Sequence, residues 1–89
     1  MTTKRLLLIH KNPTIGEVIQ AYLTDFVGWQ IEVAGSTGEG LRQAIVSQPD
    51  AIVLESYIGE IDGLLFLKRL KTQPETQSIP VLLLTLKAK

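Results

Sequence analysis

The fold is decided by eight residues in the middle of the chain, Gln48-Pro49-Asp50-Ala51-Ile52-Val53-Leu54-Glu55. Pro49 and Asp50 interrupt the preceding segment, and the apolar residues after them do not alternate with polar ones. An unalternating apolar run of this length is typical of a parallel strand covered on both faces. The sequence therefore predicts a buried strand over residues 51–54 that ends at one carboxylate, Glu55.

Similar apolar runs lie on both sides of this strand. Residues 6–9 are all leucine or isoleucine and lead into a polar turn over residues 10–13. Residues 81–85 form another run, which closes on a threonine. Residues 29–34 alternate more, as expected of an edge strand with one wetter face. We therefore expect four strands.

The segments between the strands have helical spacing and helix-end signals. Asn12 offers an N-cap ahead of Pro13, and Gly28 offers a C-terminal stop. Between them runs one apolar stripe, predicted to be the buried face: Ile15, Val18, Ile19, Tyr22, Leu23 and Phe26. A second helix is expected from a Ser36 cap to about Ser47.

The third helix is expected to open at the turn residues Asp62-Gly63 and to end near Lys71, with Leu64, Leu67 and Leu70 at helical spacing. The resulting order is β-α-β-α-β-α-β. Alternation with short connections predicts parallel strands joined by right-handed crossovers, in a three-layer α/β fold.

The composition excludes several classes of function. Nine basic residues balance nine acidic ones, so the chain has no electrostatic footprint for nucleic acid or anionic lipid. The absence of cysteine excludes disulfide and thiolate chemistry. No stretch approaches the roughly 20 apolar residues that a transmembrane helix needs. We expect one cytoplasmic domain that binds neither nucleic acid nor membrane.

The functional crevice of an open parallel α/β sheet lies beyond the carboxyl ends of its strands. The residues expected there are His10 and Lys11 after the first strand, Glu55 after the third, and Thr85 after the fourth. Residues 10–16 match neither a Walker loop nor a dinucleotide fingerprint. A flavodoxin-like protein that binds a flavin or nucleotide is therefore an alternative that these residues disfavour.

Together these segments resemble the receiver domain of response regulators in two-component (phosphorelay) signalling. Residues 6–13 are similar to its first strand and following turn, residues 48–55 to the strand that ends in the phospho-accepting aspartate, and residues 79–85 to the strand with the switch hydroxyl. The resemblance implies a flavodoxin-like (CheY-like) parallel sheet with strand order 2-1-3-4. Residues 1–89 are expected to form a single receiver-like domain that lacks the C-terminal strand and two helices.

The site residues depart from that family, in which two acidic residues and the acceptor aspartate bind Mg²⁺. His10 and Lys11 stand at the acidic-pair positions and Glu55 at the acceptor position. Mg²⁺ prefers oxygen ligands, and a lysine ammonium repels it. Without a metal, little neutralises the charge of a transferred phosphoryl group. We expect no metal, no cofactor and no catalytic residue, hence a pseudo-receiver that signals without phosphorylation; the alternative is a working phospho-accepting receiver.

Two of these residues have alternative interpretations. Glu55 is either a built-in phosphomimic, with Thr85 donating a hydrogen bond as the switch hydroxyl, or the product of drift after the site was lost. Lys11 either occupies the vacated metal position and pairs with Glu55, or is an ordinary solvated lysine. His10 is expected to make a backbone hydrogen bond at the end of its strand.

The expected interaction surface for a protein partner combines Tyr57 with three basic residues of the third helix, Lys68, Arg69 and Lys71. The alternative for these basic residues is an ordinary solvated face. The leucine-rich fourth strand would form a sheet edge, and an apolar edge strand favours association. We therefore expect either a homodimer or one piece of a longer chain.

Overall fold

The computed structural model describes residues 4–11, 13–55 and 60–84, apart from the side chains at positions 13, 15, 26 and 60–62. The elements follow the predicted order: β1 (Arg5–Ile9), α1 (Pro13–Tyr22), a π-helical turn (Leu23–Val27), β2 (Gln30–Ala34), α2 (Thr37–Ser47), β3 (Ala51–Glu55), α3 (Glu60–Lys71) and β4 (Val81–Leu84).

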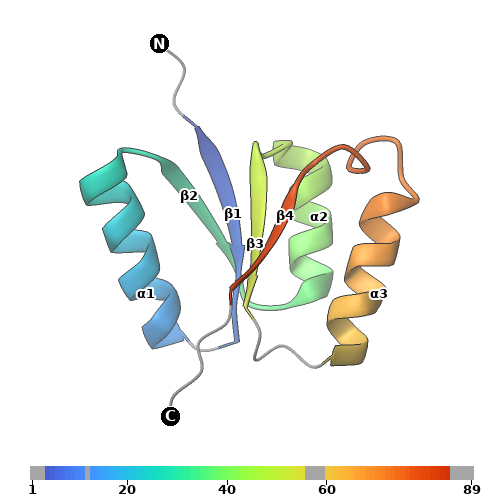
Figure 1. Cartoon of the computed structure of the whole chain (residues 1–89), viewed down its shortest axis with the longest axis horizontal. Helices are drawn as coiled ribbons and strands as arrows, with labels where there is room; N and C mark the ends of the chain where they lie inside the picture. The colour runs from blue at the N-terminus through green and yellow to red at the C-terminus, as the bar shows by residue number, and fades with distance from the viewer. Residues whose placement is uncertain (1–3, 12, 56–59, 85–89) are drawn as a thin grey trace.

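The strands form one parallel sheet in the order β2-β1-β3-β4, which confirms the predicted fold and strand order. Helix α1 lies on one side of the sheet, and α2 and α3 lie on the other (Figure 1). In the central pair, Ile9 of β1 stands opposite Leu54 of β3. This register brings the carboxyl ends of β1 and β3 together, as the expected crevice requires.

The hydrophobic core lies between the sheet and the two helices α2 and α3. Side chains from the central strands meet side chains of these helices there, in a cluster made by Leu7, Ile9, Ala34, Ala44, Ile52, Leu54, Phe66, Leu70 and Ile79. Full burial of one large aliphatic or aromatic side chain contributes about 1.5–3 kcal/mol. Leu6 and Leu8 point to the other face of the sheet and are also buried, so the apolar run of β1 does not alternate because both of its faces are covered.

Helix α2 approaches the sheet closely at Gly40. A Cβ atom at this position would collide with Cδ1 of Ile9 and would lie 2.9 Å from Cγ1 of the same side chain. The glycine is therefore required by packing, although it lowers the intrinsic helix propensity. Gly38 lies two residues earlier in the same helix, and a Cβ atom at this position would meet open space.

The ends of α2 follow the sequence signals. The Ser36 hydroxyl oxygen accepts a hydrogen bond from the Glu39 amide at 3.2 Å, which confirms the predicted N-cap. The Glu39 carboxylate in turn accepts one from the Gly35 amide at 3.1 Å. Gln48 closes the helix in the left-handed conformation, with φ at 51°. Gly28 ends the first helical segment in the same way, as predicted, with φ at 79°.

Two helix predictions are wrong. Helix α3 begins at Glu60, so Asp62 and Gly63 lie inside it and not in a preceding turn. The packing of α3 on the sheet overrides the local turn preference of an Asp-Gly pair, because tertiary contacts outweigh propensities of about 1 kcal/mol. The buried stripe predicted for α1 is also too wide, since Val18 and Tyr22 are mostly exposed.

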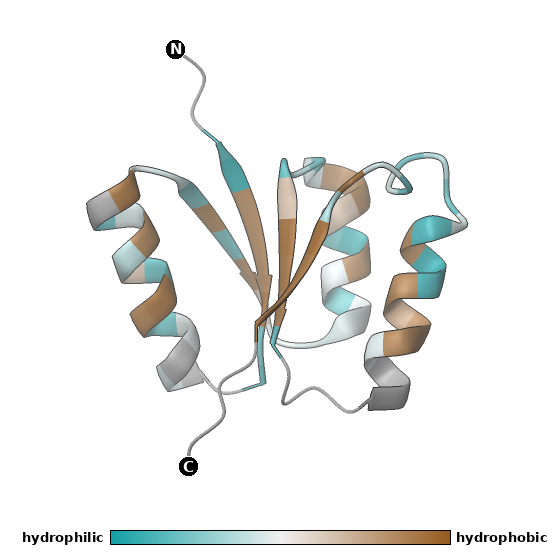
Figure 2. Ribbon diagram, viewed as in Figure 1, coloured by the Kyte–Doolittle hydropathy of each residue, from teal (hydrophilic) through white to brown (hydrophobic). Residues whose placement is uncertain are grey.

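Strand β4 pairs with β3 and forms one edge of the sheet, as expected. Its residues Leu82 and Leu83 are both largely exposed, and Figure 2 shows the apolar colour running along this strand. The connection from α3 to β4 is anchored by Thr76, a fully buried residue whose hydroxyl donates to the Leu70 carbonyl at 2.8 Å. Strand β4 is therefore held in place by its connection, and within the described residues no strand pairs with its outer edge.

Candidate functional site

Two of the predicted site residues meet at the carboxyl ends of the central strands. His10 directly follows β1, and Glu55 is the last residue of β3. Because Ile9 and Leu54 belong to the core on the α2 and α3 side, and strand side chains alternate, His10 and Glu55 project toward the α1 side. The register pairs Ile9 with Leu54, so the two residues that follow these positions lie at the same edge of the sheet.

Glu55 is buried and bonded to the main chain. Its side chain is 1% exposed, and its Oε2 accepts a hydrogen bond from the Lys11 backbone amide at 3.0 Å. The other carboxylate oxygen, Oε1, is buried and has no hydrogen-bond partner within the part of the chain that the structure describes. The carboxylate therefore ties the segment after β1 to the end of β3.

His10 continues the sheet through its main chain. Its backbone N–H donates to the Ala34 carbonyl at 3.0 Å, so the hydrogen bond at this strand end is made by the main chain. The imidazole is only 9% exposed and packs against Gly16 of α1, where a Cβ atom would lie 2.7 Å from Nε2 of the ring. Its Nδ1 is buried and lacks a hydrogen-bond partner among the described residues. The close approach of α1 thus depends on a glycine opposite the ring.

Lys11 does not pair with Glu55 through its charge. The lysine is exposed, and its contact with the carboxylate is made by the backbone amide. No ion pair joins these two residues, both of which the structure describes. Of the two alternatives for Lys11, the structure therefore supports the solvated lysine. The cause is local geometry: the main chain at the strand end directs N–H inward and the side chain outward.

This arrangement predicts that Lys11→Ala and Glu55→Gln act independently on stability. Glutamine keeps an oxygen that can accept from the Lys11 amide, and alanine keeps the amide itself. In urea unfolding experiments we expect the double variant to equal the sum of the single variants within about 0.5 kcal/mol. The exposed Lys68, combined with Glu55→Gln in the same way, provides a matched pair without contact. A coupling free energy above about 1 kcal/mol would show instead that the ammonium pairs with the carboxylate.

The donor atoms at this site do not fit a hard octahedral cation. Such a cation needs several oxygen ligands, whereas the side chains here are an imidazole, an exposed ammonium and a carboxylate already bonded through one oxygen. Within residues 4–11, 13–55 and 60–84, no three His, Cys, Asp or Glu residues lie close enough together to hold a metal ion. The chemistry that the site supports is hydrogen bonding between strand ends.

The three basic residues of the predicted interaction surface do not lie near Glu55. Thr85 and Tyr57 fall outside the described residues. Lys68, Arg69 and Lys71 lie in the last turn of α3, at the far end of that helix from the carboxyl end of β3 (Figure 1). The Lys71 ammonium donates to two backbone carbonyls of the following connection, those of Gln77 and Ile79. This lysine therefore has a structural role.

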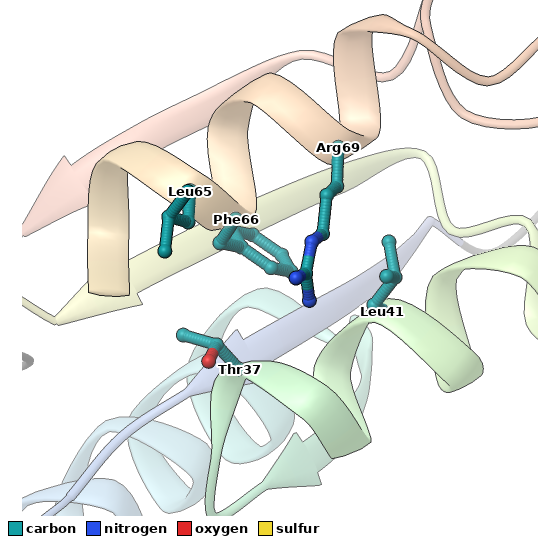
Figure 3. Close-up of a pocket in the computed structure, with 5 residues that line it drawn as sticks. All are labelled: Thr37, Leu41, Leu65, Phe66 and Arg69. Atoms are coloured by element: carbon teal, nitrogen blue, oxygen red, sulfur yellow. The ribbon is translucent and has the colours of Figure 1, made fainter. Parts of the chain in front are cut away.

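A groove between α2 and α3 was not predicted from the sequence. It encloses about 170 Å³ and is lined by Thr37, Leu41, Leu65, Phe66 and Arg69, as Figure 3 shows. The available signal was the spacing of Phe66 and Leu70, four residues apart on one helix face, which marks Phe66 as a core residue. That spacing does not reveal that part of the ring faces a cavity.

Comparison with known proteins identifies the family. The model of the response regulator receiver domain matches residues 6–89. The DNA-binding dual master transcriptional regulator RpaA of Synechocystis is 32% identical over 81 residues, which cover 91% of this chain and 33% of that protein. The chain thus spans about a third of the length of the curated relatives it matches.

Solved structures show the same fold. The N-terminal domain of a response regulator receiver protein from Methanoculleus marisnigri is 32% identical, with a TM-score of 0.85. The match covers 99% of this chain and 71% of that one. The chemotaxis response regulator CheY4 of Vibrio cholerae, at 24% identity, has the same TM-score of 0.85 over 99% and 72% of the two chains. Among the described helices, none is long and apolar enough to cross a membrane. From the family match and these structures together, the chain belongs to the response regulator receiver domain family of two-component signalling.

Proposed function

We propose that this receiver signals without being phosphorylated, through contacts with a protein partner. The observation that carries the proposal is the state of Glu55, which stands in the acceptor position. It is buried, and one of its oxygens is bonded to the Lys11 backbone amide. The carboxylate thus fastens two strand ends together, a role that competes with attack on a phosphodonor.

The electrostatics around Glu55 also oppose phosphoryl transfer. Transfer of this kind depends on positioning and on cations that neutralise charge on the phosphoryl oxygens. His10 and Lys11 replace the acidic residues that would hold Mg²⁺ in a receiver, and the donor set does not suit that ion. The proposal therefore assigns no catalytic residue and no cofactor to this chain.

The partner is proposed to be a protein. Receiver domains interact with partner signalling proteins, and the balanced charge of this chain offers no footprint for nucleic acid. DNA binding is described for RpaA, a protein about three times as long as the matched region. Strand β4, whose outer edge no described strand covers and whose Leu82 and Leu83 are exposed, supports a second contact of this kind, in which the edge pairs with another copy or another chain segment.

The absence of phosphorylation is tested with acetyl phosphate. We expect the wild-type chain, treated with acetyl phosphate and Mg²⁺, to keep its unmodified mass, because the acceptor carboxylate is buried and lacks a supporting metal site. Intact-mass and peptide-mass spectrometry provide the measurement, and a receiver with the acidic pair and acceptor aspartate shows that the reagent is active. A Mg²⁺-dependent mass increase at Glu55 would overturn the proposal.

A matched variant separates the metal site from the rest of the fold. Restoring the three acidic positions, as His10→Asp, Lys11→Asp and Glu55→Asp together, is expected to create a site at which Mg²⁺ raises the melting temperature. The wild-type chain is expected to show no such rise at the same Mg²⁺ concentration. An equal rise in both proteins would contradict the assignment of these residues.

A further inference from the structure

The groove between α2 and α3 combines three apolar side chains with a threonine and an arginine. Phe66, only 2% exposed, and the half-buried Leu41 line its interior. Leu65, at 46% exposed, forms an outer wall. Thr37, the first residue of α2, and Arg69 of α3 complete the lining. Figure 3 shows the Arg69 side chain extending from α3 toward α2, so that its guanidinium points into the space between the helices.

The volume of the groove limits what it can hold. Pockets for cofactors and other small molecules usually enclose about 300–1,000 Å³. The groove encloses about 170 Å³, which is too small for such a ligand. The mixed lining, with Leu41, Leu65 and Phe66 beside the polar Arg69, instead suits a single apolar side chain with a polar neighbour, inserted from another protein.

The charge around the groove specifies what should flank that side chain. The Arg69 guanidinium makes no hydrogen bond or ion pair with any residue that the structure describes. Lys68, its neighbour, is exposed, and the start of α2 at Thr37 adds the partial positive charge of a helix N-terminus. The acidic residue of that first turn, Glu39, is bonded to the Gly35 amide. A carboxylate beside the inserted side chain would therefore find a bidentate partner in Arg69.

We propose that this groove docks an acidic segment of a partner protein, which inserts a leucine, isoleucine or phenylalanine side chain between α2 and α3. Aspartate or glutamate next to that side chain pairs with Arg69 at the rim. The inference rests on the proposed function, since it names the surface and the chemistry of the contact through which the receiver signals. Apolar anchors surrounded by complementary charge are the usual centres of such interfaces.

The test uses a displayed library of random twelve-residue peptides, selected against the full chain. We expect the enriched peptides to combine Asp or Glu with Leu, Ile or Phe. Arg69→Glu should weaken their binding roughly tenfold or more, because it places a carboxylate against a carboxylate. Arg42→Glu makes the same charge change on α2 at an exposed position outside the groove lining, and should alter binding less than about twofold.

Leu65→Ala is an independent test that leaves the charge intact, and it should also weaken binding. NMR chemical-shift changes on peptide addition should be largest at Leu41 and Phe66. Enrichment of neutral or basic peptides, no enrichment at all, or equal loss in Arg69→Glu and Arg42→Glu would overturn the proposal. So would self-association of the chain that Arg69→Glu abolishes, because a second copy would then be the occupant. Phosphorylation at Glu55 would end the proposed function without changing these binding results, so the two failures are distinguishable.

Discussion

Phe66→Ala is expected to lower the free energy of unfolding by about 3–5 kcal/mol. The ring is 2% exposed and lies in the core that joins α3 to the sheet, so its removal leaves a cavity. A small domain has a free energy of unfolding of only about 5–15 kcal/mol, so the variant should retain little stability. Urea unfolding followed by circular dichroism measures the change.

The control for this prediction lies two residues earlier on the same helix. Leu64 is 66% exposed, and Leu64→Ala should change stability by no more than about 0.5 kcal/mol. This expectation corrects the sequence interpretation, in which Leu64 marked the apolar face of the helix. Comparable losses for Leu64→Ala and Phe66→Ala would show that α3 presents a different face to the sheet.

Two alanine substitutions in α2 are expected to have opposite signs. Gly40→Ala should destabilise the protein by about 1–3 kcal/mol, because the added methyl group collides with the buried side chain of Ile9. Gly38→Ala should stabilise it by up to about 1 kcal/mol, because the position is exposed, has open space and gains helix propensity. Thermal and urea unfolding of the two variants, which make the same chemical change two residues apart, measure the difference.

A second substitution identifies the collision. Ile9→Val removes Cδ1, the atom nearest to the added methyl group, and should reduce the cost of Gly40→Ala in the double variant. The same Ile9→Val background should leave the gain from Gly38→Ala unchanged. Equal costs of Gly40→Ala in both backgrounds would mean that contact with Ile9 does not determine the effect.

The sheet could be predicted from the sequence because its signals are strong and local. The apolar runs at residues 6–9 and 51–54 do not alternate, and this pattern is typical of strands covered on both faces. Once four strands and three helices alternate, handedness restricts the possible topologies to a few. The positions of His10 and Glu55 follow from the same reasoning, since strand ends in a parallel sheet meet at one edge.

The contacts within the site could not be predicted, because main-chain geometry decides them. Residue types left open whether Lys11 pairs with Glu55 through its charge or is solvated. In the structure the contact is made by the Lys11 amide, which every residue type except proline could supply. The start of α3 and the exposed side of α1 were missed for a related reason. Each depends on how much of a helix reaches the sheet, which is a property of the packed fold.

The hydrogen bond between Glu55 and the Lys11 amide has a consequence for how information passes through this protein. In a working receiver, a kinase phosphorylates the acceptor carboxylate and hydrolysis removes the phosphoryl group, so the carboxylate alternates between two states. Under the proposed function this carboxylate stays hydrogen-bonded to the main chain, so it does not alternate between two states. The strength of the signal is then set by mass action, through the amounts of the chain and its partner and the affinity between them. Synthesis and turnover of the protein then control the signal, and the signal lasts as long as the protein molecule itself.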